Sequence, residues 1–562
     1  MNNQPVRKEP AGGRTPRLRL ATAILLIAAA FLSGYFLPRD DDFFALRKNF
    51  RIFGALFEEV VADYVDPIDS GRLMRAGIDG MLEQLDPYTV FLDEADQAEF
   101  DIMSRGRYGG VGLTVGLREG RLTVIAPIEG TSGFRQGVRP GDVILEIDGR
   151  STEDMTLGDA RTLLRGEPGT PVALLIGRQG VVEPLDFRLM REDVRVRDVT
   201  FAGFVHDDTA RAIGYVKLDR FARNAPGETR AAIESLLQPG PLSGFILDLR
   251  DNPGGLLEGA VEIAGIFLEE GLDVVTIRGR GADSERVYRT RQAPLAADVP
   301  LIVLINEGSA SASGIVAGAV QDYDRGVVVG SPSFGKGLVQ TIRKLPYNTS
   351  LKMTTARYFT PSGRSIQSST FQSPAGAGGS LRTFSTVAGR QVRDGNGIEP
   401  DVVAGHRMRS ELEVALERRA AFFLYANHFA AQHEVIEGDF SASDDVLSDF
   451  RAWLEREQFT YQTESERALG ALRDALSGTG YERAVASTEA LEQTVRADKD
   501  LDFERYADPI KERLSSEIMA RFVSESDLVR ASFHVDEAIL DAVAILGDPN
   551  RYADLLSPTE NR

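Results

Sequence analysis

The chain has 562 residues, a formal net charge of -20 at neutral pH and no cysteine. Because one hydrophobic core rarely supports this length, we expect several domains. The acidic balance disfavours a nucleic-acid partner, since phosphate binding needs clustered Lys and Arg, and the lack of cysteine excludes disulfides, thiolate catalysis and cysteine-bound zinc.

An uncharged apolar run, LATAILLIAAAFLSGYFL, occupies residues 20–37. At about 1.5 Å rise per residue, a helix of this length just crosses a bilayer core of about 30 Å. Basic residues precede the run and acidic residues follow it, so the positive-inside rule places the chain from about residue 40 onward outside the cytoplasm. A cleaved signal peptide is the alternative, but no clear A-x-A site follows. We therefore expect a single-pass anchor in the inner (cytoplasmic) membrane, with the catalytic part on the periplasmic or extracellular side.

Helical patterns with apolar residues three and four positions apart follow in RIFGALFEEVVADYV and GRLMRAGIDGMLEQL. LDPYTVFL then indicates a turn leading into an extended segment. From about residue 105 to 191 the pattern changes to short apolar runs such as DVILEIDG and PVALLIGR, separated by Gly and Pro turns. This change predicts a small β-rich domain.

Strand and helix patterns alternate over residues 192–404, in segments such as GFILDLR, LLEGAVEIAGIFLEE, PLIVLIN and GVVVG. This alternation predicts an α/β layer fold with catalytic loops at strand ends. A Gly/Ser/Ala-rich loop is expected at residues 372–397, and the remaining chain is helical in pattern. The expected fold class is therefore α/β multidomain, with an N-terminal transmembrane helix, a β-rich domain, an α/β core and an all-α C-terminal region.

A cluster of serines, EGSASAS, follows the strand PLIVLIN and precedes a helix beginning near residues 311–313. A serine at such a turn presents its hydroxyl beside free helix N-terminal amides, which favour an oxyanion. Simple helix capping is the alternative, because serine is a preferred cap. A histidine base is improbable, since the chain has only five histidines, none near this cluster in the sequence, and no G-x-S-x-G elbow.

Lys336, in GSPSFGKGLVQ, is the stronger candidate for a base. A free lysine with a pKa of about 10.4 is rarely neutral at physiological pH, so burial must lower its pKa by about three units, which lies within the documented range. Neighbouring Phe334, Leu338 and Val339 would supply an apolar wall, and Gln340 would orient the amine. A phosphate-binding loop is disfavoured because Gly337 follows the lysine where Ser or Thr is needed. Plain surface charge stays open as an alternative.

The strand GFILDLR runs directly into Asn252, Pro253, Gly254 and Gly255 before another helix. Glycines let the backbone approach a ligand closely and turn its amides toward a developing negative charge. An ordinary strand-to-helix turn is the alternative reading.

SASAS, FGKG followed by Gln, and the upstream DLRDNPGG together closely resemble the C-terminal processing peptidases, also called tail-specific proteases. LDPYTVFL, LLRGEPGT and TTARYFTPSGRSIQ look like further landmarks, and the resemblance covers most of residues 60–404. It implies a Ser/Lys serine peptidase whose core resembles the ClpP/crotonase-like spiral. The implied site consists of the nucleophile Ser311, the base Lys336, the orienting Gln340, and oxyanion donors from Ala312 and from Gly254 or Gly255.

RYGGVGLTV, with GVRPGDVILEIDG after it, resembles a PDZ domain. In such a domain a glycine-rich loop offers amides to a terminal carboxylate while a strand edge accepts an extended peptide. A glycine-rich hairpin is the alternative. The predicted carboxylate loop consists of Tyr108, Gly109, Gly110, Val111 and Gly112.

We therefore expect a serine endopeptidase that binds protein or peptide substrates with accessible C-termini and uses no metal or other cofactor. Two alternatives stay open. One is a catalytically impaired PDZ scaffold or regulatory binding protein, which Gly314 favours because the family usually has glutamate there; the other is a latent enzyme. The C-terminal helices are expected to assemble a homo-oligomer or bind an adaptor. The predicted domains are residues 1–19 (cytoplasmic tail), 20–37 (anchor), 38–104 (N-terminal helical part), 105–191 (PDZ), 192–404 (peptidase core) and 405–562 (helical domain).

Overall fold

The computed structural model describes residues 40–206, 212–281, 284–367, 382–405, 407–438 and 440–558. The chain divides into two compact units, Met1–Gln84 and Leu85–Arg562. The predicted anchor at residues 20–37 lies outside the described residues. Among the helices that are described, none combines the length and the apolar character needed to cross a membrane.

The first unit contains two helices, α2 (Asp40–Asp63) and α3 (Ser70–Leu82), which confirm the two helical patterns predicted from the sequence. The Asp69 carboxylate starts α3 by accepting hydrogen bonds from the amides of Gly71 and Arg72.

The second unit begins with three short elements, β1 (Val90–Leu92), α4 (Glu94–Arg105) and β2 (Arg107–Gly110). A small β-rich part follows, as predicted. Its antiparallel sheet has the order β3-β4-β5-β7-β8, so β3 is an edge strand. Its elements are β3 (Leu113–Arg118), β4 (Arg121–Pro127), α5 (Ser132–Arg135), β5 (Val143–Ile147), β6 (Arg150–Ser151), α6 (Leu157–Leu164), β7 (Pro171–Gly177) and β8 (Leu185–Met190). The strand β9 (Glu192–Arg195) then pairs with β2.

A six-stranded sheet with the order β10-β11-β12-β15-β16-β21 forms the α/β core. All its strands are parallel to their neighbours except β10. The fully buried runs of β12 and β15 are typical of parallel strands covered on both faces. The strands are β10 (Val199–Phe204), β11 (Ile213–Leu218), β12 (Gly244–Asp248), β15 (Leu301–Ile305), β16 (Val327–Gly330) and β21 (Val402–Val403).

The two faces of this sheet are covered by different parts of the chain. Val216, Leu247 and Val303 pack into one core with the helices α7 (Ala225–Leu237), α8 (Leu257–Ala264) and α9 (Ala312–Asp322). Tyr215 and Ile246 pack on the opposite side with α18 (Glu537–Leu546), which comes from the C-terminal helical region. The helical region is thus part of the core that supports the sheet.

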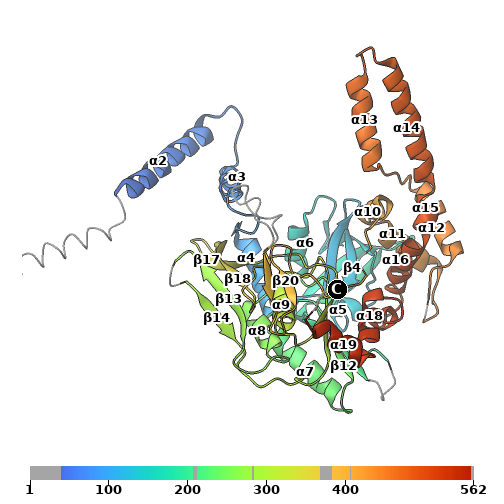
Figure 1. Cartoon of the computed structure of the whole chain (residues 1–562). Coiled ribbons are helices and arrows are strands. Elements are labelled where there is room, and N and C mark those ends of the chain that lie inside the picture. Colours follow the sequence, from blue (N-terminus) through green and yellow to red (C-terminus); the bar gives the residue numbers. More distant parts are fainter. Residues whose placement is uncertain are drawn as a thin grey trace, which may run out of the picture. The chain divides into compact units, whose positions relative to one another are not determined.

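A second sheet pairs the start of this unit with residues far along the chain. Its order is β1-β18-β13-β14, with β17 also paired to β18, and β1 lies antiparallel to β18 with Val90 opposite Lys352. These strands are β13 (Asp273–Gly279), β14 (Arg286–Arg289), β17 (Leu338–Lys344) and β18 (Ser350–Phe359). Figure 1 shows β13, β14, β17 and β18 side by side.

The prediction of a loop at residues 372–397 is wrong for residues 382–397, the part of this segment that the structure describes. The strands β19 (Thr383–Ser385) and β20 (Gln391–Arg393) form a hairpin there. A buried Arg390, paired with Asp324 and Asp401, fixes this hairpin to the core. The sequence pattern missed the hairpin because these ion pairs join residues that are far apart in the sequence, and such contacts leave no alternation of apolar and polar residues within the strands themselves.

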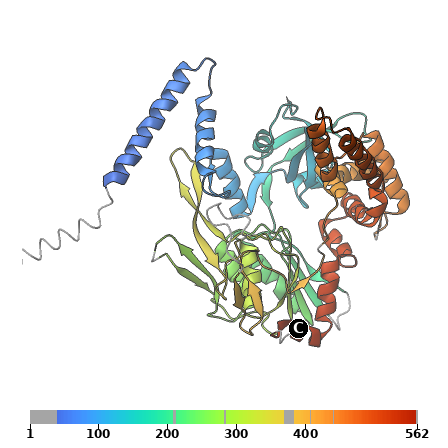
Figure 2. The same cartoon turned by 45° about the horizontal axis from the view of Figure 1, so that its top comes forward.

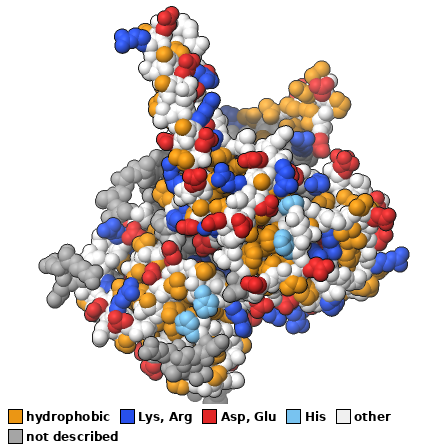
Figure 3. Space-filling view, turned by 90° about the vertical axis from the view of Figure 1, so that its right-hand side faces the viewer, with side chains coloured by type: hydrophobic (Ala, Val, Ile, Leu, Met, Phe, Trp, Pro, Cys, Tyr) orange, Lys and Arg blue, Asp and Glu red, His pale blue; other side chains and the backbone are white. Residues whose placement is uncertain are grey.

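Helices make up most of the described chain from residue 411 onward, as predicted, and α13 (Glu464–Leu476) and α14 (Glu482–Asp500) form a hairpin that projects from the rest of this region (Figure 1). Figure 2 shows the β-rich part beside the C-terminal helical region. The Arg118 guanidinium lies 5.4 Å from the centre of the ring of Phe423, which belongs to α11 (Ala421–Gln432). Figure 3 shows acidic and basic side chains interspersed on one face of the molecule. The remaining helices are α10 (Glu411–Arg418), α12 (Asp444–Arg456), α15 (Asp502–Arg505), α16 (Ala507–Met519), α17 (Glu525–Ser532) and α19 (Pro549–Leu556).

Candidate active site

Ser311 occupies the turn between β15 and α9 and differs from the two serines beside it. The hydroxyls of Ser309 and Ser313 are buried and donate to the carbonyl oxygens of Leu249 (2.7 Å) and Asn252 (2.9 Å). The Ser311 hydroxyl does not cap α9 and lies beside the phenol of Tyr358. The middle serine of the cluster is therefore the one whose hydroxyl is not tied to a backbone carbonyl.

The backbone of Ser311 is strained, with φ 54° and ψ -110°, a conformation that non-glycine residues rarely adopt. The turn at residues 252–255 packs closely against the backbone of Ser311. A Cβ atom added at Gly254 would lie 2.6 Å from the Ala310 oxygen and 2.9 Å from Ser311 Cβ. Asn252 ties the two turns together, because its carbonyl oxygen accepts the Ala310 amide at 2.9 Å. The close approach of the turns thus requires glycine.

The amides near Ser311 differ in their availability to an oxyanion. The Gly254 amide donates to Asn252 Oδ1 at 2.9 Å and is already occupied. The amides of Gly255 and Ala312 make no hydrogen bond within the part of the chain that the structure describes. Gly255 has φ 152°, and a Cβ atom there would lie 2.2 Å from the Phe221 oxygen. Of the two glycines that the sequence left open, Gly255 is the one with an available amide.

Lys336 lies in the loop between β16 and β17 and is largely buried. Burial lowers the pKa of Lys336 to about 8; the Lys352 ammonium acts in the same direction, and the Asp86 carboxylate opposes it. The Lys336 Nζ atom lies 4.8 Å from the centre of the Tyr88 ring, while Phe334, expected to help bury the lysine, is itself exposed. A base near neutral pH is therefore available, and Tyr88 of the LDPYT segment is a site residue that the sequence did not reveal.

Tyr358 connects the backbones of the predicted nucleophile and base. Its buried hydroxyl lies 3.0 Å from the Ser311 carbonyl oxygen and also contacts the carbonyl oxygen of Lys336. Burial raises the pKa of Tyr358 far above its usual value, so the phenol stays a hydrogen-bond donor. No hydrogen bond joins Ser311 Oγ to Lys336 Nζ in the described structure.

Gln340 lies on β17 opposite Thr354 of β18. Its side-chain amide donates to Thr354 Oγ1 at 3.4 Å, and this hydroxyl donates to Asp86 Oδ1 at 3.2 Å. Asp86 also accepts the amides of Tyr88 and Thr89, each at 2.9 Å. The network anchors the LDPYT turn beside β17, and the predicted contact from Gln340 to the lysine amine does not occur among these residues.

Gly314 lies inside α9 and is buried. A Cβ atom there would lie 2.6 Å from Ile366 Cδ1 and 3.8 Å from the Tyr358 hydroxyl. The space that a glutamate would need is therefore taken by Ile366.

The predicted carboxylate loop is divided between a strand and a turn. Tyr108, Gly109 and Gly110 lie in β2, paired with β9. The Gly112 amide has no partner among the residues described, whereas the Val111 amide faces the end of α6, where Gly110 pairs with Arg165. The Gly112 amide directly precedes the edge strand β3, and α6 contacts that strand. The arrangement suits an extended peptide that ends at the Gly112 amide.

Comparisons with known proteins agree with these features. The model of peptidase family S41 matches residues 212–373, the PDZ domain model matches residues 123–178, and the model described as "Probable PDZ-protease, C-terminal helical domain" matches residues 412–546. A carboxy-terminal-processing protease of Bartonella bacilliformis is 40% identical over 323 residues, which cover 57% of this chain and 73% of that protein. A probable CtpA-like serine protease of Staphylococcus aureus is 34% identical over 322 residues, and the match spans 57% of this chain and 63% of the staphylococcal protein, less than two thirds of its length.

Among solved structures, the photosystem II D1 C-terminal processing protease is 27% identical, with a TM-score of 0.35. That match covers 63% of this chain and 92% of the solved chain.

Proposed function

The chain belongs to the carboxy-terminal-processing proteases of peptidase family S41, and we propose that Ser311 is the nucleophile and Lys336 the general base of this serine protease. The observation that carries the assignment is that Ser311, alone among the three clustered serines, does not donate its hydroxyl to a backbone carbonyl of the described fold. A lysine whose pKa is about 8 supplies the proton acceptor that the histidine-poor sequence lacks.

The chemistry follows from these positions. Neutral Lys336 takes the proton from Ser311 Oγ as this oxygen attacks the substrate carbonyl carbon. The amides of Ala312 and Gly255 donate to the resulting oxyanion. The Lys336 ammonium then gives its proton to the leaving amine, and water hydrolyses the acyl-enzyme to release the new carboxylate and restore Ser311. Gln340 acts on this step only indirectly, through Thr354 and the LDPYT turn.

The substrates that we propose are proteins or peptides with accessible C-termini, bound at the Gly112 amide. A terminal carboxylate pairs with this free amide, and the edge of β3 supplies main-chain hydrogen bonds to the preceding residues. Amidation of the substrate C-terminus removes the charge and is expected to raise KM with little effect on kcat.

The test uses an unstructured reporter protein with an apolar C-terminus, incubated with the full-length chain and with Ser311→Ala and Lys336→Met variants. We expect cleavage by the parent and a loss of at least about 1000-fold in both variants. Full activity in either variant would remove the corresponding residue from the mechanism. Binding of the reporter without cleavage by the parent would instead favour the scaffold alternative.

A latent resting state is a second candidate, because Ser311 and Lys336 are not hydrogen-bonded and the lysine ammonium lies on the Tyr88 ring. Activation then requires the amine to move toward the serine. Adding a free C-terminal peptide in trans should accelerate cleavage of a short internal peptide; an unchanged rate would indicate a constitutively competent site.

We further propose that residues 20–37 anchor the chain in the inner membrane and that the protease part lies on the periplasmic or extracellular side. The support is the apolar run and its flanking charges in the sequence. Externally added protease should degrade the catalytic part in spheroplasts, and complete protection would reverse the orientation. The domain boundaries stay predictions, as does assembly through the C-terminal helices.

A further inference from the structure

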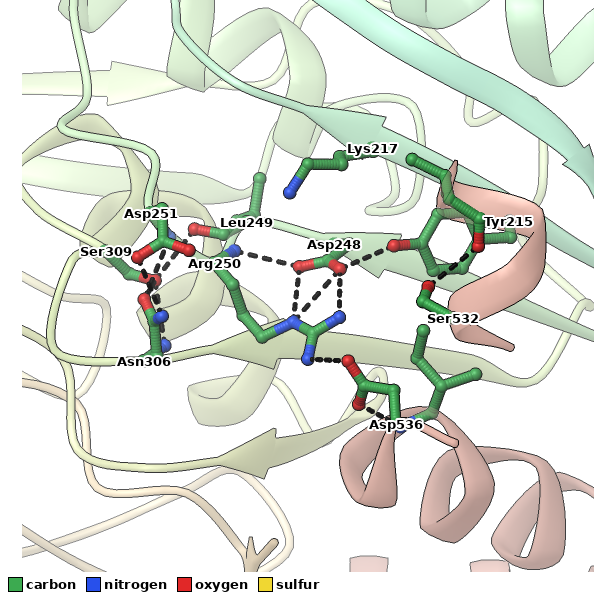
Figure 4. Close-up of polar contacts among 12 residues, drawn as sticks. Tyr215, Lys217, Asp248, Leu249, Arg250, Asp251, Asn306, Ser309, Ser532 and Asp536 are labelled. Atoms are coloured by element: carbon green, nitrogen blue, oxygen red, sulfur yellow. Dashed lines mark hydrogen bonds and ion pairs between the residues drawn. The ribbon is translucent and has the colours of Figure 1, made fainter. Parts of the chain in front are cut away.

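Asp536, in the C-terminal helical region, contacts Arg250 at the end of β12, next to the turn at residues 251–255. Its side chain caps α18 through Oδ1, which accepts the Ile539 amide at 3.1 Å. Its Oδ2 atom accepts a hydrogen bond from Arg250 Nη1 at 2.7 Å. One carboxylate therefore joins the start of α18 to the residue that directly precedes the DNPGG turn (residues 251–255), as Figure 4 shows.

Arg250 is fixed between two carboxylates. The Asp248 carboxylate is fully buried at the end of β12 and accepts Arg250 Nη2 at 2.6 Å and the hydroxyl of Tyr215 at 2.6 Å. Burial alone would raise the pKa of Asp248, but the guanidinium prevails and lowers it to about 2, so the carboxylate is ionised. Asp248 holds one side of the guanidinium, and Asp536 holds the other.

An aromatic contact docks the same helical segment independently of the ion pair. Phe533, three residues before Asp536, is buried, and the centre of its ring lies 4.9 Å from that of Tyr215. α18 itself packs on the sheet through Ile539. Because the helix is fixed by apolar packing, the Asp536 carboxylate is a preorganised partner for Arg250.

The DNPGG turn follows Arg250 directly. Its first residue, Asp251, has φ 61°, a left-handed conformation that costs a non-glycine residue energy, whereas Gly254 and Gly255 adopt positive φ freely. The same turn carries Asn252, whose carbonyl oxygen accepts hydrogen bonds from the serine turn, and the available amide of Gly255. A shift of Arg250 is therefore transmitted to the oxyanion-binding amide within a few residues.

We propose that Asp536 is a positioning residue for catalysis: by holding Arg250 from the helical region, it fixes the DNPGG turn so that the Gly255 amide meets the oxyanion. This inference deepens the proposed function and rests on it. The C-terminal helical region is then part of the catalytic apparatus, although it contributes no residue that touches the substrate carbonyl.

A pocket of about 260 Å³ opens beside this contact and is lined by Lys217, Arg250 and Asp536 among others. The side chains of Arg250 and Asp536 are 19% and 23% exposed to solvent. Loss of Asp536 would therefore leave the guanidinium beside water, so the fold is expected to survive while Arg250 gains freedom.

The experiment compares Asp536→Ser with Asp548→Ser in the full-length chain. Serine keeps helix capping in both, but at position 536 it is too short to reach Arg250. Asp548 caps α19 by accepting the Asn550 and Arg551 amides, and no ion pair joins it to the described residues. The control therefore reproduces the effect on a helix cap in the same region without the link to Arg250.

We measure kcat and KM with the reporter, the inhibition constant of a peptide aldehyde whose hemiacetal carries an oxyanion, and the urea unfolding midpoint. For Asp536→Ser we expect kcat to fall by at least about tenfold and the aldehyde constant to rise by a similar factor, because small misplacement of catalytic groups is costly. KM should stay within about twofold. Asp536→Asn leaves a single acceptor oxygen where the carboxylate used one for the Ile539 amide and one for Arg250, so its kcat should also fall below that of the parent.

Equal kcat values in Asp536→Ser and Asp548→Ser, whether both are unchanged or both reduced, would overturn the inference while leaving Ser311 and Lys336 in their roles. A parent chain that neither cleaves the reporter nor reacts with a serine-directed fluorophosphonate would overturn the proposed function as well.

Discussion

The Tyr358 hydroxyl lies 3.0 Å from the carbonyl oxygen of Ser311, so β18 is joined directly to the turn that carries the proposed nucleophile. The same hydroxyl contacts the Lys336 carbonyl. One phenol therefore links the backbones of the proposed nucleophile and the proposed base.

Tyr358→Phe should lower both stability and activity. Buried carbonyl oxygens lose their donor, which costs about 1–3 kcal/mol, and Ser311 and Lys336 lose a common support, so kcat should also fall. Tyr323→Phe is the control, since it removes a phenol hydrogen bond to Asp273 (2.9 Å) at the other end of α9. Urea unfolding and reporter kinetics on both variants separate the two effects. A kcat loss that is equal in the two variants would deny Tyr358 a special role at the site.

Activity should rise with pH around the pKa of Lys336, because only the neutral amine accepts the serine proton. With that pKa at about 8, kcat/KM is low at pH 6 and approaches a plateau above pH 9. The acid limb is measured with the reporter at constant ionic strength. A limb centred near pH 10 would show that the lysine is not desolvated in the working enzyme.

Lys352→Met should move this limb to higher pH. Removing the neighbouring positive charge makes the Lys336 ammonium less unfavourable, which raises the pKa of Lys336. Lys344→Met, at an exposed lysine of the same β17–β18 hairpin, is the matched control and should leave the profile unchanged. A shift toward acid in Lys352→Met would contradict the assigned electrostatics.

The three clustered serines should separate stability from catalysis. Ser309→Ala and Ser313→Ala each remove a buried hydroxyl that donates to a backbone carbonyl, at a cost of about 1–2 kcal/mol. Ser311→Ala should leave the unfolding midpoint nearly unchanged, because its hydroxyl donates to no backbone carbonyl in the described fold. A destabilised Ser311→Ala variant would indicate a structural role for that hydroxyl.

Gly314→Glu should weaken the protein rather than improve it, although the family resemblance implies glutamate at this position. The new side chain meets Ile366 Cδ1 in a buried helix, and overpacking of this kind costs about 1–3 kcal/mol. The double variant Gly314→Glu/Ile366→Ala should recover part of the loss if the clash is the cause. Full stability of the single variant would contradict the packing argument.

Local sequence patterns predicted the supporting fold and the main chemistry, but not how the site is completed. The buried strands β12 and β15, the turn at Ser311 and the loop at Lys336 follow from short apolar runs, glycines and motifs. Which glycine amide is available depends on the direction of the Asn252 side chain, which no motif fixes.

The contributions of Tyr88 and Asp536 also lay beyond sequence reasoning. They arise from contacts with Lys336 and Arg250 over very long sequence distances. Tyr88 comes from the turn before β1, and Asp536 caps a helix that otherwise looks unrelated to catalysis. Both contacts arise from tertiary packing, which cannot be read from hydrophobic periodicity or from secondary-structure propensity.

The pairing of β1 with β18 has a consequence for biosynthesis. The turn that covers the lysine amine is made early, but its partner strand follows only after some 260 further residues. At a synthesis rate of about 5–20 residues per second, this delay lasts on the order of ten seconds or more. The contact between Tyr88 and Lys336 therefore cannot form while the early segments emerge, and this part of the proposed base site is completed only after β18 has been synthesised.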